Sequence, residues 1–98
     1  MDTEDVIATL REHEAELRSA GIVRLSVFGS VARGDQTAQS DVDLIAEFDK
    51  NKTLDAADKG RLESRLADFL GTKVDLSSAD WMKDSVRMQA LREAVLAF

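Results

Sequence analysis

Two aspartates one residue apart, Asp41 and Asp43, stand at the start of an apolar segment and are well placed to do chemistry. On a strand, side chains two positions apart share one face, with Cβ atoms about 6.5 Å apart. At an effective dielectric constant of about 20, two like charges at that distance repel each other by roughly 2.5 kcal/mol. A divalent cation relieves this repulsion, and Mg²⁺ is typically held by one or two carboxylates with phosphate oxygens and water. The alternative is a pair of solvated aspartates at the beginning of a strand.

A Gly-Ser pair, Gly29-Ser30, precedes these aspartates and has the composition of a phosphate-binding turn. Glycine lets the backbone approach a phosphate closely, the Ser30 hydroxyl offers a hydrogen bond, and the Arg33 guanidinium can pair with a phosphate as a fork. Gly and Ser are also common in ordinary turns, and Arg33 equally suits a plain surface position. Gly29 and Gly34 have the spacing of P-loop glycines, but Asp35 replaces the P-loop lysine, which excludes a Walker-type NTPase.

A third carboxylate, Asp75, lies in a short apolar segment later in the chain. If that segment is a strand beside the aspartate strand, Asp75 shares a face with Asp41 and Asp43. It would then activate an attacking hydroxyl, directly or as a shared metal ligand. Two further candidates are weaker. His13 falls at the edge of an apolar helix stripe, and Trp81 is explained either by packing or by contact with a partner.

The elements that must position these residues follow from hydrophobic periodicity and from helix stop signals such as Gly71. We expect helices over 3–20, 53–70 and 80–97 and strands over 22–28, 41–48 and 73–77. Along 41–48, apolar side chains alternate with Asp41, Asp43 and Glu47. The pattern predicts an α/β (α+β) fold, in which a small mixed sheet carries helices on one face and leaves the other face bare. The last helix, ending in Phe98, either completes the core or docks on a partner.

Composition bounds the remaining choices. The chain has 98 residues, a formal net charge of −6 and no cysteine, which predicts a single domain over residues 1–98 without disulfides. The negative charge argues against direct nucleic-acid binding. No apolar run is long enough to span a bilayer, so we expect a cytoplasmic protein without a membrane partner.

Taken together, these segments resemble the DNA polymerase β-like nucleotidyltransferase superfamily. The resemblance rests on Gly29-Ser30, Arg33-Gly34-Asp35 and Ser40-Asp41-Val42-Asp43-Leu44, and more weakly on Lys73-Val74-Asp75-Leu76. Because the chain ends after the core, it is most similar to the minimal nucleotidyltransferases (the MNT family), which are usually antitoxins paired with HEPN-domain ribonuclease toxins.

The resemblance implies a protein adenylyltransferase that moves AMP from ATP to a tyrosine of the toxin, with which it forms a hetero-oligomer. It also implies that Asp41, Asp43 and Asp75 are catalytic and bind two Mg²⁺ ions, while Gly29, Ser30 and Arg33 bind the nucleotide. Two other functions stay open: an antitoxin that neutralises its toxin by binding alone, and a nucleotidyltransferase that acts on a small molecule or nucleic acid.

Overall fold

A mixed sheet lies at the centre of the computed structural model, which describes residues 2–29, 41–51 and 54–98. Within this described part the sheet has four strands in the order β3-β2-β1-β4. Strand β1 is antiparallel to both β2 and β4, whereas β2 is parallel to β3. The strands are β1 (Ile22–Phe28), β2 (Val42–Phe48), β3 (Val74–Ser78) and β4 (Val95–Leu96). The helices are α1 (Thr3–Glu12), α2 (Glu14–Ser19), α4 (Ala56–Leu70), α5 (Asp84–Glu93) and a short 3-10 turn, η1 (Ala79–Trp81).

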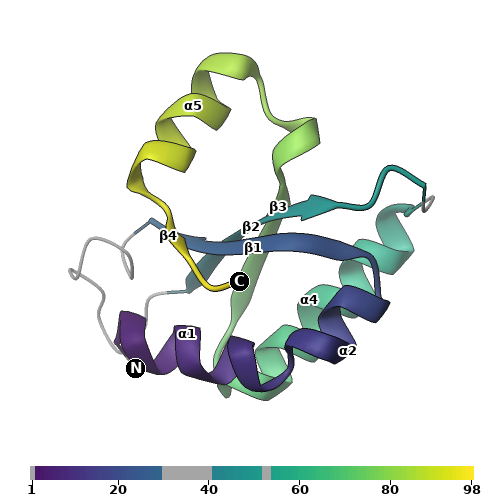
Figure 1. Cartoon of the computed structure of the whole chain (residues 1–98), viewed down its shortest axis with the longest axis vertical. Helices are drawn as coiled ribbons and strands as arrows, with labels where there is room; N and C mark the ends of the chain where they lie inside the picture. The colour runs from purple at the N-terminus through teal and green to yellow at the C-terminus, as the bar shows by residue number, and fades with distance from the viewer. Residues whose placement is uncertain (1, 30–40, 52–53) are drawn as a thin grey trace.

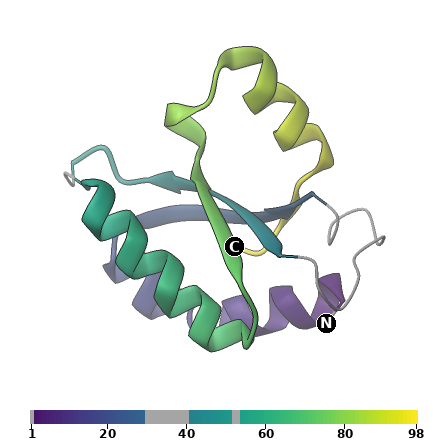
Figure 2. The same ribbon diagram turned by 180° about the vertical axis from the view of Figure 1, so that it is seen from behind.

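Helices α1, α2 and α4 form one layer beneath the sheet, and α5 stands on the opposite side (Figures 1 and 2). The main core lies between the sheet and the first layer. It joins buried side chains from α1, α2, α4, strands β1, β2 and β3, and the residue after β4, including Leu10, Leu17, Leu25, Leu44, Leu66, Leu76 and Ala97. This arrangement confirms the predicted α/β fold with a small mixed sheet.

Helix ends explain where the predicted helices begin and stop. The predicted helix over 53–70 starts at Ala56 because Asp55 caps it, and Asp55 and Asp58 form a reciprocal capping box. Gly71, with φ 68°, ends it in the left-handed conformation that glycine tolerates. The predicted helix over 3–20 is divided at His13, whose ring stacks on Phe69 with centroids 3.6 Å apart.

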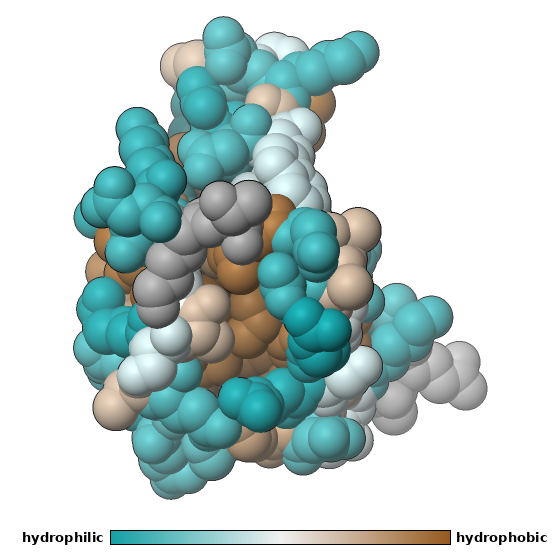
Figure 3. All heavy atoms as spheres, turned by 90° about the vertical axis from the view of Figure 1, so that its right-hand side faces the viewer, coloured by the Kyte–Doolittle hydropathy of each residue, from teal (hydrophilic) through white to brown (hydrophobic). Residues whose placement is uncertain are grey.

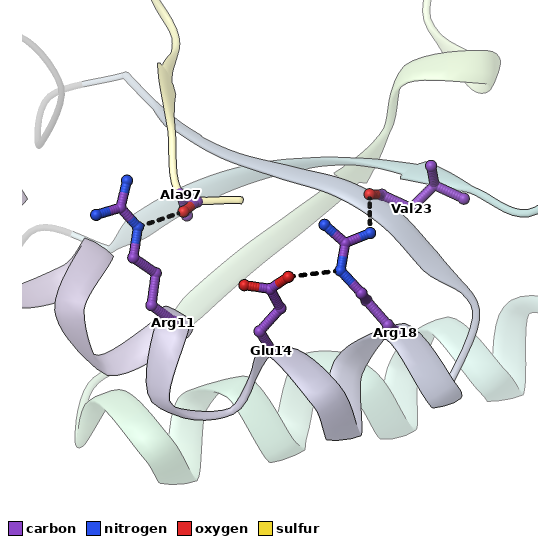
Figure 4. A network of polar contacts seen from close by, with 5 residues as sticks. All are labelled: Arg11, Glu14, Arg18, Val23 and Ala97. Atoms are coloured by element: carbon purple, nitrogen blue, oxygen red, sulfur yellow. Dashed lines mark hydrogen bonds and ion pairs between the residues drawn. The ribbon is translucent and has the colours of Figure 1, made fainter.

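Two arginines tie the first helical layer to the sheet (Figure 4). The Arg11 Nε donates to the Ala97 carbonyl over 2.7 Å, next to the strand at one edge of the sheet. Arg18 donates from Nε to Glu14 over 2.7 Å and from Nη1 to the Val23 carbonyl over 2.8 Å. Hydrogen bonds of charged donors are stronger than neutral ones, so these contacts fix the first layer against β1 and the last residues.

The C-terminal segment differs from the prediction of one helix over 80–97. It divides into η1, α5 and β4, and the Leu25 N–H donates to the Phe98 carbonyl over 3.0 Å. The edge of β1 presents unpaired N–H and C=O groups, and pairing with β4 satisfies them where a continued helix would not. As a result Val86 and Leu91 are exposed (52% and 41%).

The second face of the sheet is therefore not bare throughout. Ile45 of β2 is buried there in a small cluster with Ala79 of η1 and Ala90 of α5, against which Phe28 packs. Helix α5 thus packs on this face at Ile45, and the cluster adjoins the carboxylates, because Phe28, which packs against it, pairs with Asp43.

Candidate active site

The candidate site lies where β2 and β3 begin, on the second face of the sheet. The two strands are parallel, with Asp43 directly opposite Asp75 in the ladder. Their chain neighbours Leu44 and Leu76 are fully buried in the main core. Because successive side chains alternate between faces, Asp43 and Asp75 must point to the other face. Adjacent strands lie about 4.8 Å apart, so the two carboxylates are lateral neighbours, as the sequence predicts.

Gly29, just after β1, lies against the Asp43 carboxylate. It follows Phe28, which pairs with Asp43 across the antiparallel ladder, and it has φ 75°. A Cβ added at Gly29 would lie under 3.0 Å from the Asp43 Oδ2 and 3.1 Å from its Cγ. The backbone of Gly29 therefore lies directly against the carboxylate, and only glycine leaves room for both.

Asp41 directly precedes β2, two residues before Asp43. Because Val42 pairs with Val74, Asp41 lies beside Lys73, and its Oδ2 is 3.9 Å from the Lys73 Nζ. Lys73 is 82% exposed, so this ion pair is open to water and weak. Within the residues described, no three Asp, Glu, His or Cys side chains are grouped closely enough to hold a metal ion between them. The three carboxylates share a face without meeting at one point.

Part of the predicted site lies outside the described residues. This applies to Ser30 and Arg33, the other two predicted nucleotide-binding residues, and to Gly34, Asp35 and Ser40 of the surrounding motif. Of the predicted nucleotide-binding group, the structure places Gly29 alone.

The two weaker candidates are not brought to this site by any described contact. His13 packs face to face on Phe69, away from the carboxylates of the candidate site. Trp81 of η1 is 61% exposed and lines a small hollow with Phe48 and Asp49, at the end of β2 away from Asp41. Its exposure argues against a packing role.

Sequence reasoning missed Lys73, which contacts Asp41, and Glu63, which contacts the backbone of the residue after Asp75. Lys73 could have been found by aligning Lys73-Val74-Asp75 with Asp41-Val42-Asp43, since parallel pairing puts Lys73 next to Asp41. The Glu63 carboxylate of α4 accepts the Leu76 N–H. The sequence gives no signal for this contact, because charged residues are common on the exposed side of a helix.

A separate hollow of about 170 Å³ lies between α2 and the start of α4, lined by Ala20, Leu54, Asp58, Arg61, Leu62 and Arg65. Figure 3 looks at this side of the molecule and shows a hydrophobic floor inside a hydrophilic rim. The Asp55 N–H, which donates to the Asp58 carboxylate, lowers the pKa of Asp58, and Arg61 lowers this pKa further. Both arginines already pair with acids, Arg61 with Asp58 and Arg65 with Glu16, and neither Asp43 nor Asp75 lines the hollow.

Comparison with known proteins matches this arrangement to one family. The sequence profile of the nucleotidyltransferase domain matches residues 10–97, which include both aspartate strands and the Gly29 turn. The chain belongs to the nucleotidyltransferase family. A protein adenylyltransferase, MntA of Thermococcus cleftensis, is 34% identical to this nucleotidyltransferase over 93 residues, covering 94% of this chain and 92% of that protein.

Solved structures have the same fold as this nucleotidyltransferase. One named as a candidate minimal nucleotidyltransferase has a TM-score of 0.82 and 39% identity, covering 97% of this chain and 95% of its own. A toxin–antitoxin complex with AMP-PNP gives a TM-score of 0.73 at 22% identity, covering 100% and 73%. A complex of tri-AMPylated Shewanella oneidensis HEPN toxin with its MNT antitoxin gives 0.68 at 19% identity, covering 93% and 70%. The last two likenesses concern the fold alone.

Proposed function

We propose that this nucleotidyltransferase is the antitoxin of a HEPN/MNT pair and transfers AMP from ATP to a tyrosine of its cognate HEPN toxin. The single observation that carries the proposal is the register of β2 and β3, which sets Asp43 opposite Asp75 and next to the Gly29 backbone. Two carboxylates on paired strands beside a glycine turn suit a reaction at a phosphate.

In this reaction the tyrosine oxygen attacks the α-phosphorus of ATP. A P–O bond forms to the tyrosine, the bond to the β-phosphate oxygen breaks, and pyrophosphate leaves with the electron pair. The proton of the tyrosine hydroxyl passes to the Asp75 carboxylate and then to water. Gly29 lets the turn after β1 lie against the Asp43 carboxylate, and we assign Gly29, Ser30 and Arg33 to the β- and γ-phosphates on the basis of their motif.

The carboxylates fit a magnesium site by their chemistry. Asp41, Asp43 and Asp75 offer only oxygen ligands on one partly exposed face, and Mg²⁺ prefers oxygen ligands and keeps several waters. No single ion needs all three carboxylates, because one or two with water and phosphate oxygens hold Mg²⁺, so in our proposal Asp41, Asp43 and Asp75 would together hold two ions. When bound, the ions supply positive charge that stabilises the attacking and leaving oxygens.

The acceptor and partner are inferred from the relatives. The relative from Thermococcus cleftensis is named a protein adenylyltransferase, and the Shewanella complex contains an AMPylated HEPN toxin with an MNT antitoxin. This chain matches the first of these over nearly its whole length. We therefore propose a hetero-oligomer with a HEPN toxin in the cytoplasm. In the described part of the chain, no helix has the length and apolar character needed to cross a membrane.

A second candidate function, neutralisation by binding alone, is favoured by one feature. Most of the exposed large hydrophobic side chains of the described residues belong to the segment from η1 to β4: Trp81, Val86, Met88, Leu91 and Leu96. Such a surface suits contact with a protein, whether or not AMP is transferred.

The experiment that separates these functions uses α-³²P-labelled ATP, Mg²⁺ and the protein encoded next to this gene. Label on that protein, lost with Asp43→Asn and kept with Asp68→Asn, supports AMP transfer. Asp68 is an exposed aspartate on α4, so its variant matches the charge change away from the site. Toxin inhibition that survives Asp43→Asn without label would identify a binding antitoxin. Label on a small molecule or nucleic acid in place of protein would refute the proposed acceptor.

A further inference from the structure

Strand β3, which carries Asp75, is an edge strand of the sheet described above. It pairs with β2 on one side and is the last strand of the order on the other. An edge strand lacks hydrogen bonds along one side, so its position is less constrained than that of a central strand. Asp75 must face Asp43, so β3 needs a further contact to fix its position.

Glu63 of α4 supplies that contact. Its Oε2 accepts the backbone N–H of Leu76 over 2.9 Å, in a partly buried position. Leu76 directly follows Asp75 and is itself fully buried. Hydrogen bonds to an ionised acceptor are shorter and stronger than neutral ones. The bond therefore holds the backbone of β3 one peptide unit away from the Asp75 side chain.

The helix that carries Glu63 is firmly anchored. Its neighbours Leu62 and Leu66 are buried in the main core, at 6% and 0% exposure. The Glu63 side chain is thus fixed at its base by packing and at its tip by the hydrogen bond to Leu76. Together these contacts set how far β3 extends along β2.

We propose that Glu63 is a positioning residue for Asp75: by anchoring the outer edge of β3 it keeps the Asp75 carboxylate level with Asp43. This inference rests on the proposed function, because it assigns Glu63 a role in the same carboxylate site. Glu63 does not touch substrate. A displacement of about 1 Å in a reacting group can lower a rate by roughly 10²-fold, so losing the anchor is enough to affect the reaction.

The test compares Glu63→Met, which keeps the side-chain length but cannot accept the bond, with Glu63→Gln, which retains an acceptor oxygen. With rates normalised to folded protein, we expect Glu63→Met to lower kcat at least about tenfold while KM for ATP changes less than about twofold. We expect Glu63→Gln to stay within about threefold of the unsubstituted protein. Equal losses of kcat in both variants would overturn the positioning role. A smaller amount of folded Glu63→Met with an unchanged normalised kcat would overturn it as well.

A second measurement does not depend on AMP transfer. Mn²⁺ is titrated into each protein while NMR follows the broadening of the Asp75 backbone amide and the hydrogen exchange of the Leu76 amide. We expect Glu63→Met to weaken Mn²⁺ binding about tenfold and to speed the Leu76 exchange, and Glu63→Gln to do neither. If the unsubstituted protein binds Mn²⁺ but transfers no AMP, the proposed acceptor fails while the role of Glu63 is still decided by this titration. If Mn²⁺ broadens no aspartate at all, the carboxylate site and this inference both fall.

Discussion

Replacement of Gly29 by alanine tests the close contact between the glycine turn and Asp43. The new Cβ would lie under 3.0 Å from the Asp43 Oδ2 and 3.1 Å from its Cγ. The carboxylate must therefore rotate away, by about 1 Å at the oxygen. Such a displacement lowers catalysis by roughly 10²-fold when the group takes part in the reaction.

The effect on stability should be much smaller. The positive φ of Gly29 costs an alanine about 1–2 kcal/mol, and the reduced freedom of the unfolded chain returns part of this. Because a carboxylate is a movable side chain, the contact itself adds little. We expect a net loss of about 1 kcal/mol in the free energy of unfolding, measured by urea denaturation.

Gly71→Ala is the matched control for this prediction. Gly71 also has a positive φ, 68°, but a Cβ there meets nothing within 4 Å. It should lose a similar amount of stability and keep its AMP-transfer rate within about twofold. If Gly29→Ala transfers AMP as fast as Gly71→Ala, Asp43 does not act from the position seen here, and our view of the site is wrong.

Three further predictions concern charge and packing. Asp43→Asn should abolish AMP transfer. Because it relieves repulsion from Asp75, it should leave the free energy of unfolding unchanged or, without metal, raise it by up to about 1 kcal/mol. A marked drop in melting temperature would mean that the carboxylate is structural. The lowered pKa of Asp58 means that its charge stabilises the fold at neutral pH and that this contribution is lost as the pH falls below about 4. The melting temperature should therefore fall more steeply with acid for the unsubstituted protein than for Asp58→Asn, and parallel curves would contradict this. Leu66→Ala, in the main core, should cost about 3 kcal/mol in urea unfolding, and a loss below 1 kcal/mol would show that the cavity collapses.

The sequence was sufficient wherever local pattern and tertiary packing agree. The β-branched segment over 22–28 is β1 to the residue, and the alternation over 41–48 gives both the strand and the face of Asp43. The face of Asp75 followed from one assumption, that the third strand lies beside the second, and the parallel pairing of β2 and β3 confirms it.

The sequence failed where the outcome depends on a distant element. The local sequence of residues 95–98 gives no signal that a helix ends before them. They leave the helical conformation because they form hydrogen bonds with the open edge of β1. Ile45 shares a face with Asp43 and Glu47, which the sequence pattern leaves bare, and only the placement of η1 and α5 shows that it is buried. Glu63 likewise has no signal of its own, because its role arises from how α4 lies against β3.

The order of the elements has a consequence for how this protein can be switched off. Asp43 and Asp75 are neighbours in the sheet, yet the whole of α4 separates them along the chain. A single proteolytic cut within that helix would leave both aspartates chemically intact, but only the ladder and the core packing would then hold the two strands together. Under the proposed function, such a cut would lower AMP transfer without removing either aspartate, so the integrity of α4 would limit how long the protein stays active.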